Sequence, residues 1–140
     1  QPRSRGLGDV YKRQHKDNTL PENGEVFVFG SNLAGIHGAG AAKQAYLKFG
    51  ARPGHGIGLT GSSYAIPTKD QDLNTMKLES IKPYIERFKK FTLEHPTVEF
   101  FITRVGCGLA GYKDKEVAPL FRGCGPNCSF PEQWEFYLKD

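Results

Sequence analysis

The stretch Val26–Ala42, VFVFGSNLAGIHGAGAA, decides the fold, because it joins four strand-forming residues to a glycine-rich turn and a helix start. The nearly continuous apolar run predicts a strand buried on both faces. Glycines spaced G-x-x-G-x-G follow it at Gly35, Gly38 and Gly40. A strand, a glycine loop and a helix together point backbone N–H groups at an anion, and glycine allows close approach. The alternative is a tight strand-to-helix turn without a ligand, since such patterns often occur alone.

A second apolar run, Val98–Val105, leads into a second glycine loop, Gly106–Gly111. Loops that follow parallel strands meet at the carboxyl edge of a sheet, where open α/β sheets bind their ligands. Two anion-binding loops at one edge suit a diphosphate better than either loop alone.

The remaining segments alternate between strand and helix patterns, which predicts an α/β fold with a mixed, mostly parallel sheet. Trp134 is expected to pack into the core. Thr-Lys-Asp after Pro67 predicts a polar loop that ends a strand. The expected strands are Glu25–Phe29, Ile57–Leu59, Ser63–Ile66, Val98–Val105 and Asn127–Phe130, and the expected helices are Ala41–Phe49, Leu78–Leu93, Lys113–Phe121 and Pro131–Leu138.

Length and composition exclude several classes of protein. The 140 residues fit one domain, and 38% hydrophobic content argues against disorder. No apolar run approaches the ~20 residues that cross a bilayer, so no membrane partner is expected. Three cysteines form no disulfide framework, and a reducing, cytoplasmic setting is expected. We expect a monomer.

Residues 1–14, QPRSRGLGDVYKRQ, have no period and no apolar face. They resemble a translated adaptor or vector leader, so a single domain over residues 15–140 is expected. The alternative is a genuine basic arm. The leader carries a net charge of +3 of the chain's +4, so the domain itself is nearly neutral and a plain nucleic-acid module is disfavoured.

Three segments, Gly30–Ala42, Tyr64–Lys69 and Arg104–Asp114, together resemble a macrodomain, the ADP-ribose-binding fold. The resemblance runs from about Glu25 to Phe121. It implies a macrodomain-like three-layer α-β-α sandwich. In that family, an Asn-bearing glycine loop holds the distal ribose and diphosphate, and a second loop closes over the phosphates.

The elements IPTKD (Ile66–Asp70) and GCGLAG (Gly106–Gly111) are similar to the branch of terminal ADP-ribose glycohydrolases and DNA ADP-ribosyl glycohydrolase antitoxins. Ala110 stands where one enzyme of this branch has a catalytic Asp, which DNA-directed relatives also lack. The chain shows no Gly-Asp-Ile/Leu element of the kind that macrodomains use near the adenine.

The resemblance implies that Lys69 is a catalytic nucleophile, because a neutral amine can attack the anomeric carbon of an ADP-ribosyl group. The alternative is a solvated lysine in a turn. Asn32 would bond the ribose or position the scissile bond, unless it is a turn or cap residue. His37 could act as acid or base, or be merely solvated. Asp70 and Asp114 are candidates for activating water or holding Lys69.

The resemblance further implies the residues that bind the ligand, which is ADP-ribose or an ADP-ribosylated DNA, RNA or protein. No cofactor is expected, and no metal, because Cys124-x-x-x-Cys128 lacks a second ligand pair. Cys107 is expected to be a packing residue. The activity expected is hydrolysis of ADP-ribosyl linkages; the alternatives are a non-catalytic reader and an ADP-ribose 1″-phosphate phosphatase using His37 and an Asp. The expected ligand-binding residues are Gly30, Ser31, Asn32, Gly35, Ile36, His37, Gly38, Ala39, Gly40, Thr68, Gly106, Cys107, Gly108, Leu109, Ala110, Gly111 and Tyr112.

Overall fold

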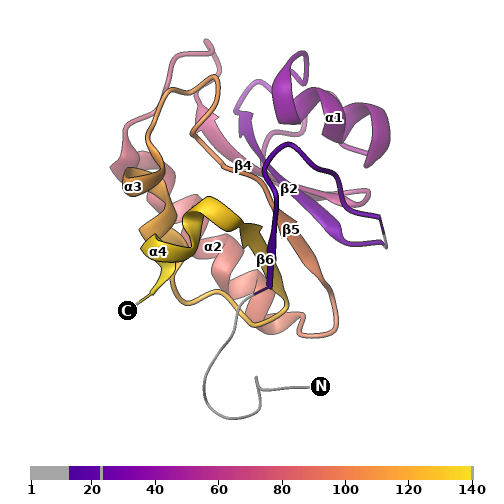
Figure 1. The fold of residues 1–140 in the computed structure, drawn as a ribbon. Coiled ribbons are helices and arrows are strands. Elements are labelled where there is room, and N and C mark those ends of the chain that lie inside the picture. The colour runs from indigo at the N-terminus through magenta and orange to yellow at the C-terminus, as the bar shows by residue number, and fades with distance from the viewer. Residues whose placement is uncertain (1–12, 23, 140) are drawn as a thin grey trace.

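A six-stranded sheet with the strand order β1-β6-β5-β2-β4-β3 forms the centre of the computed structural model, which describes residues 13–22 and 24–139 (Figure 1). All neighbouring strands run parallel except β3, which is antiparallel to β4. The predicted α/β class with a mixed, mostly parallel sheet is confirmed. The strands are β1 (Arg13–His15), β2 (Val26–Asn32), β3 (Gly58–Thr60), β4 (Ser63–Lys69), β5 (Phe100–Ile102) and β6 (Cys128–Pro131).

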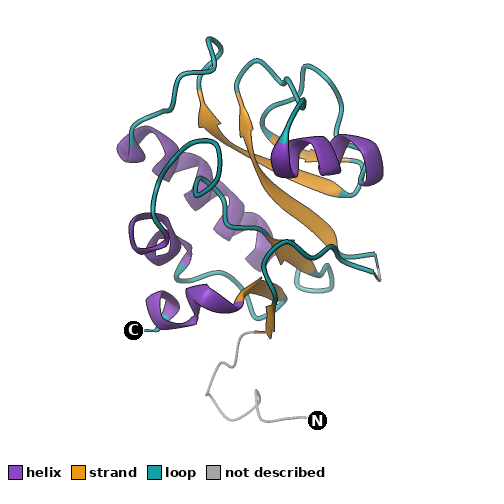
Figure 2. Cartoon of the chain, turned by 45° about the horizontal axis from the view of Figure 1, so that its top comes forward, coloured by secondary structure: helices purple, strands orange, loops and turns teal. Residues whose placement is uncertain are grey.

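Helices cover both faces of the sheet, as Figures 1 and 2 show. One face carries α1 (Gly40–Lys48), and the opposite face carries the longest helix, α2 (Leu78–Glu94), with the short helices α3 (Asp114–Val117) and α4 (Glu135–Leu138). The 3-10 turn η2 (Ala118–Phe121) directly follows α3, and the 3-10 turn η3 (Glu132–Trp134) directly precedes α4. No helix in the described ranges is long and apolar enough to cross a membrane.

Alternating side chains of β2 build two separate cores, because successive residues of a strand point to opposite faces. Val26 and Val28 pack against α2 on one face, whereas Phe27 and Phe29 pack against Ala42 and Ala45 of α1 on the other. The expectation that this strand is buried on both faces is therefore confirmed.

The larger core lies on the α2 face and contains Trp134, which is fully buried against Phe121 and Phe130. Its packing there confirms the expected core role. Helix α2 contributes Ile81, Ile85 and Phe88, spaced as one helical face requires.

Several predicted boundaries differ from the structure. Strand β4 continues through Pro67 to Lys69, where a polar loop was expected, because Pro67 lies at an irregular register opposite Ser31. Tyr46 of α1 is 48% exposed, since the helix contacts the sheet through two small alanines, Ala42 and Ala45. The strand expected over Val98–Val105 is only Phe100–Ile102. Each of the two last expected helices is divided into an α-helix and a 3-10 turn.

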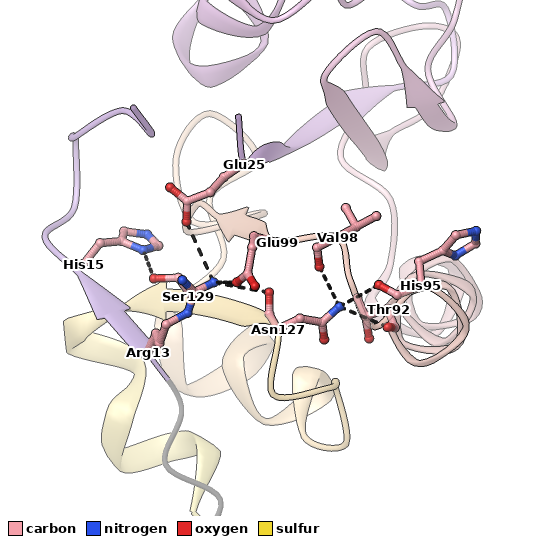
Figure 3. Close-up of polar contacts among 9 residues, drawn as sticks. All are labelled: Arg13, His15, Glu25, Thr92, His95, Val98, Glu99, Asn127 and Ser129. Carbon is pink, nitrogen blue, oxygen red and sulfur yellow. Dashed lines mark hydrogen bonds and ion pairs between the residues drawn. The ribbon is translucent and has the colours of Figure 1, made fainter. Parts of the chain in front are cut away.

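Strand β1 was not expected from the sequence. It includes Arg13 and Gln14, which the leader hypothesis sets apart from the domain, and it pairs with β6. Residues 1–12 of the proposed leader lie outside the described residues. Arg13 forms an ion pair with Glu99 and lies 3.9 Å from a carboxylate oxygen of Glu25 (Figure 3). These contacts attach β1 to the sheet.

His15 fixes the other end of β1. Its ring stacks on Phe101 with 3.7 Å between centroids, and its Nε2 lies 2.9 Å from the Ile102 carbonyl oxygen. Because a carbonyl only accepts, Nε2 carries the proton, and Nδ1 accepts from the Ser129 hydroxyl at 2.7 Å (Figure 3). Burial lowers the pKa of His15 from 6.5 to about 4, so the folded protein holds this ring neutral at pH 7.

The pH dependence of stability tests this arrangement. Between pH 4 and 6.5 the unfolded chain binds a proton at His15 that the folded chain does not, so stability falls as the pH falls through this window. His15→Phe keeps a ring on Phe101 but cannot titrate. We expect the free energy of unfolding of the variant to depend less steeply on pH, by up to about 1.4 kcal/mol per pH unit, the contribution of one proton. Urea unfolding followed from pH 4.5 to 7.5 measures this slope. Equal slopes in both proteins would contradict the assignment.

Candidate functional site

A cavity of about 980 Å³ lies at the carboxyl edge of the parallel strands β2, β4 and β5. Both glycine loops and Lys69 contribute to its walls. Parallel pairing explains this convergence, because strands that run the same way deliver their following loops to one edge. The edge was expected to hold the site, and this cavity lies there.

Most of the sequence-predicted residues line this cavity. Six do not, namely Gly35, His37, Asp70, Gly111, Tyr112 and Asp114. The structure therefore brings together the residues Gly30, Ser31, Asn32, Ile36, Gly38, Ala39, Gly40, Thr68, Lys69, Gly106, Cys107, Gly108, Leu109 and Ala110.

Asn32 closes the first glycine loop as well as lining the cavity. Its Nδ2 donates to the Ile36 carbonyl at 2.8 Å, and the Ile36 N–H donates to its Oδ1 at 2.9 Å. This is the turn role weighed in the sequence analysis. The amide retains a second N–H and a second lone pair, so it can still contact a ligand.

The first loop ends at the N-terminus of α1, which is open to the cavity. The N-cap residue, Ala39, has no side-chain oxygen that could accept from the first helical N–H groups, and the first turn holds no acidic residue. Gly40, Ala41 and Ala42 all line the cavity. The partial positive charge of this helix end is therefore available to an anion.

Residues 52–56 support the first loop from behind. The Ser31 hydroxyl donates to the Gly56 carbonyl at 2.5 Å, and the Gly54 N–H donates to the Gly35 carbonyl at 2.9 Å. A Cβ on Gly35 would overlap the backbone of Gly54, and one on Gly56 would overlap the Asn32 carbonyl oxygen. The two segments therefore touch backbone to backbone.

His37 belongs to this support and does not reach the cavity. The residue is only 8% exposed, and its ring lies edge-on to Phe29 and places Nε2 2.9 Å from the Arg52 carbonyl oxygen. The carbonyl can only accept, so Nε2 donates. In the structure, His37 therefore holds the first glycine loop against residues 52–56. This is neither the solvated nor the acid–base role considered from the sequence.

The second loop leaves three backbone N–H groups available. Gly106 and Gly111 adopt positive φ angles of 78° and 90°, and turn bonds use the N–H groups of Cys107, Gly111 and Tyr112. The N–H groups at positions 108–110 donate to none of the described residues. Such a run of free N–H groups can surround an anion.

Tyr112 holds the second loop to the segment that follows Lys69. Its hydroxyl donates to the Met76 carbonyl, and the Thr75 hydroxyl donates to the Ala110 carbonyl at 3.0 Å. Tyr112 therefore positions the loop without lining the cavity itself.

Lys69 ends β4 with its backbone fixed on both sides. Its carbonyl accepts from the Leu33 N–H at 2.9 Å, and it forms a bridge with Thr75. Within the described ranges, no carboxylate oxygen lies within 4.0 Å of Lys69 Nζ. Asp70 does not hold Lys69, because its Oδ1 accepts from the N–H groups of Asp72 and Asn74 and orders the following turn.

Asp114 is bound by other side chains. Arg104 donates to both of its oxygens at 2.8 and 3.0 Å, and Trp134 Nε1 donates to Oδ1 at 2.7 Å. Burial alone would raise the pKa of Asp114, but these hydrogen bonds outweigh it and lower the pKa below its usual value. Arg104 also donates to Asp17 at 3.2 Å. The carboxylate thus anchors the cavity wall and lies outside the cavity.

Cys107 lines the cavity as an inert thiol. Burial, followed by the neighbouring Asp114 carboxylate, raises its pKa to about 12. The thiolate needed for nucleophilic attack is therefore scarce at neutral pH, which agrees with the expected packing role. No group of three or more His, Cys, Asp or Glu side chains in the described part of the chain could hold a metal ion.

The sequence analysis did not identify half of the residues that line the cavity. Only Gln44 and Lys48 carried a usable signal, since they follow Gly40 at four-residue intervals and so share a helix face with it. The missed lining residues are His15, Asp17, Asn18, Thr19, Leu20, Phe27, Ala41, Ala42, Gln44, Lys48, Leu73, Phe101, Thr103 and Arg104.

Comparison with known proteins identifies no relative. No family model matches the chain, and no match was found among curated proteins or solved structures. The function of the cavity is therefore inferred from its own residues.

The backbone contact behind the first loop gives a direct test. Gly56→Ala must displace the Asn32 turn, whereas a Cβ on Gly108 meets nothing within 4 Å. We expect Gly56→Ala to lower the free energy of unfolding by about 1–3 kcal/mol, the range for overpacking, and Gly108→Ala to change it by less than about 0.5 kcal/mol. Urea titration of both variants measures this. Similar stabilities would show that residues 52–56 do not support the loop.

Proposed function

We propose that the cavity binds ADP-ribose and that the protein hydrolyses ADP-ribosyl linkages with Lys69 as the nucleophile. One observation carries the proposal: both glycine loops and Lys69 lie in the wall of a single cavity at the carboxyl edge of the sheet. The motifs that resemble a macrodomain contribute these same walls. The cavity volume also falls within the range of small-molecule sites.

The anion-binding groups support a diphosphate between the loops. The open N-terminus of α1 contributes one set of donors, and the free N–H groups of positions 108–110 contribute another. Each set follows a different strand, β2 or β5, and the two strands are neighbours. Two adjacent donor sets match the two phosphates of a diphosphate better than a single phosphate.

The order of the strands then orients the ligand. ADP-ribose has a ribose on either side of its diphosphate. With the diphosphate over β2 and β5, one ribose extends towards β4, which ends at Lys69, and the other extends towards β1. The distal ribose, which carries the scissile bond, fits the β4 side because a nucleophile stands there.

The chemistry assigned to Lys69 is a two-step displacement. The neutral Nζ attacks C1″ of the distal ribose, the bond from C1″ to the acceptor breaks, and the proton released by the amine goes to the departing acceptor. Water then hydrolyses the lysyl adduct, which releases ADP-ribose and restores the amine. No ion pair with the described carboxylates holds Nζ away from the ribose. The acceptor is DNA, RNA or protein.

Binding is the first property to measure. ADP-ribose should bind at least 10-fold more tightly than AMP, because AMP lacks the second phosphate and the distal ribose and so forfeits more than about 1.4 kcal/mol of contacts. Isothermal titration calorimetry with both ligands gives the ratio. An absence of preference at millimolar ligand would refute the binding proposal.

Turnover is the second property. Lys69→Ala should abolish release of ADP-ribose while binding changes little, because the loops carry the diphosphate contacts. Lys69→Arg should fail as well, since a guanidinium remains protonated. Lys82→Ala, an exposed lysine on α2, is the matched control and should retain full turnover. The assay follows ADP-ribose released from ADP-ribosylated DNA and, separately, from ADP-ribosylated protein.

Two outcomes would revise the proposal. Wild-type turnover by Lys69→Ala would eliminate the lysine mechanism. Binding of ADP-ribose by a wild type that cleaves neither substrate would make the protein a reader of ADP-ribosyl groups.

A further inference from the structure

The cavity extends beyond the glycine loops along the length of α1. Gly40, Gln44 and Lys48 line it at intervals of one helical turn, about 6 Å each. Opposite them, residues 17–20 follow β1 on the same face of the sheet (Figure 1), and Phe27 and Phe101 form the floor. We call this part of the cavity, between α1 and residues 17–20, the inner lobe. It adjoins the β1 side, where the second ribose of the ligand extends.

The inner lobe exists because a helix covers only part of one face of the sheet. Helix α1 covers that face over β2 and β4, and an irregular segment covers the remainder, whereas α2, α3 and α4 share the other face (Figure 2). The floor is apolar, since Phe27 and Phe101 are 2% and 5% exposed. A planar aromatic group suits a site with such a floor.

Gln44 is the unsatisfied polar group of this lobe. Its Oε1 is buried without a hydrogen-bond partner, and the side chain bonds to none of the described residues. Buried amide oxygens are normally paired, so an unpaired one in a cavity wall calls for an explanation. Rotation about the last torsion of the side chain can present the oxygen or the NH₂ group to the cavity.

We propose that Gln44 is the residue that recognises the base of the ligand, as an adenine. Its oxygen accepts from the exocyclic amine of adenine while its NH₂ group donates to N7, the bidentate pairing that glutamine makes with this edge. The assignment rests on the proposed function, which supplies an adenosine on the β1 side. A base with a carbonyl in place of the amine, such as hypoxanthine, presents two acceptors to the amide and loses one bond.

A comparison of two ligands tests this role. ADP-ribose and inosine diphosphate ribose differ only in the base, where a carbonyl replaces the exocyclic amine and N1 gains a proton. The wild type should bind ADP-ribose about 10-fold more tightly, in line with the discrimination of one bidentate pair. Gln44→Leu removes both bonds to adenine and the one remaining bond to hypoxanthine, so it should weaken ADP-ribose about 10-fold more than inosine diphosphate ribose, and the preference should disappear. Lys43→Ala, exposed on the same helix, should keep the preference.

The outcomes separate this inference from the proposed function. Tight binding of ADP-ribose with a preference that survives Gln44→Leu overturns the role of Gln44 and leaves the proposed function standing. Equal weakening of both ligands by Gln44→Leu also overturns it, because a merely structural residue would act that way. Failure of the wild type to bind either ligand overturns both. Gln44→Glu, nearly isosteric, covers the case in which the leucine variant misfolds: its carboxylate cannot donate to N7, which both bases share, so both ligands should weaken, but it still accepts from the exocyclic amine and should keep the preference for ADP-ribose.

Discussion

The parallel pairing of β2 with both β4 and β5 is the constraint on which the site depends. It places Asn32 beside Lys69 and puts the second glycine loop within reach of the first. Gly30 shows how close this approach is, because a Cβ there would lie 3.4 Å from the Gly106 nitrogen. The alternating valines and phenylalanines of β2 stabilise the pairing from both faces. The same four residues therefore contribute to both cores and fix the position of the loops that follow the strands.

Local sequence patterns predicted the elements whose formation depends mainly on residues close together in the chain. The buried β2 strand, the turn glycines and the periodic face of α2 are each encoded within a few neighbouring residues. The convergence of Asn32, Lys69 and the two loops also followed from the sequence, since parallel strands leave little choice of edge. The loop residues that line the cavity could therefore be predicted from the sequence.

Partners distant in the sequence decided the rest. Asp114 was a catalytic candidate by position, but Arg104 and Trp134 take up its oxygens, and Trp134 is twenty residues away. His37 lies outside the cavity, where its Nε2 donates to the Arg52 carbonyl. Strand β1 depends on Glu99 and Ser129, more than eighty residues further on. No local pattern carries that information, so neither β1 nor the wall formed by residues 17–20 could be anticipated.

The wall formed by residues 17–20 has an unusual kind of attachment. The helices opposite are embedded in a core, whereas this wall depends on Leu20 packed against the smaller core and on one ion pair between Asp17 and Arg104. That pair is partly exposed, with side chains 24% and 32% accessible, and mobile ions weaken such pairs. Ionic strength therefore acts more on this side of the cavity than on the other, where α1 is attached to the sheet through apolar side chains.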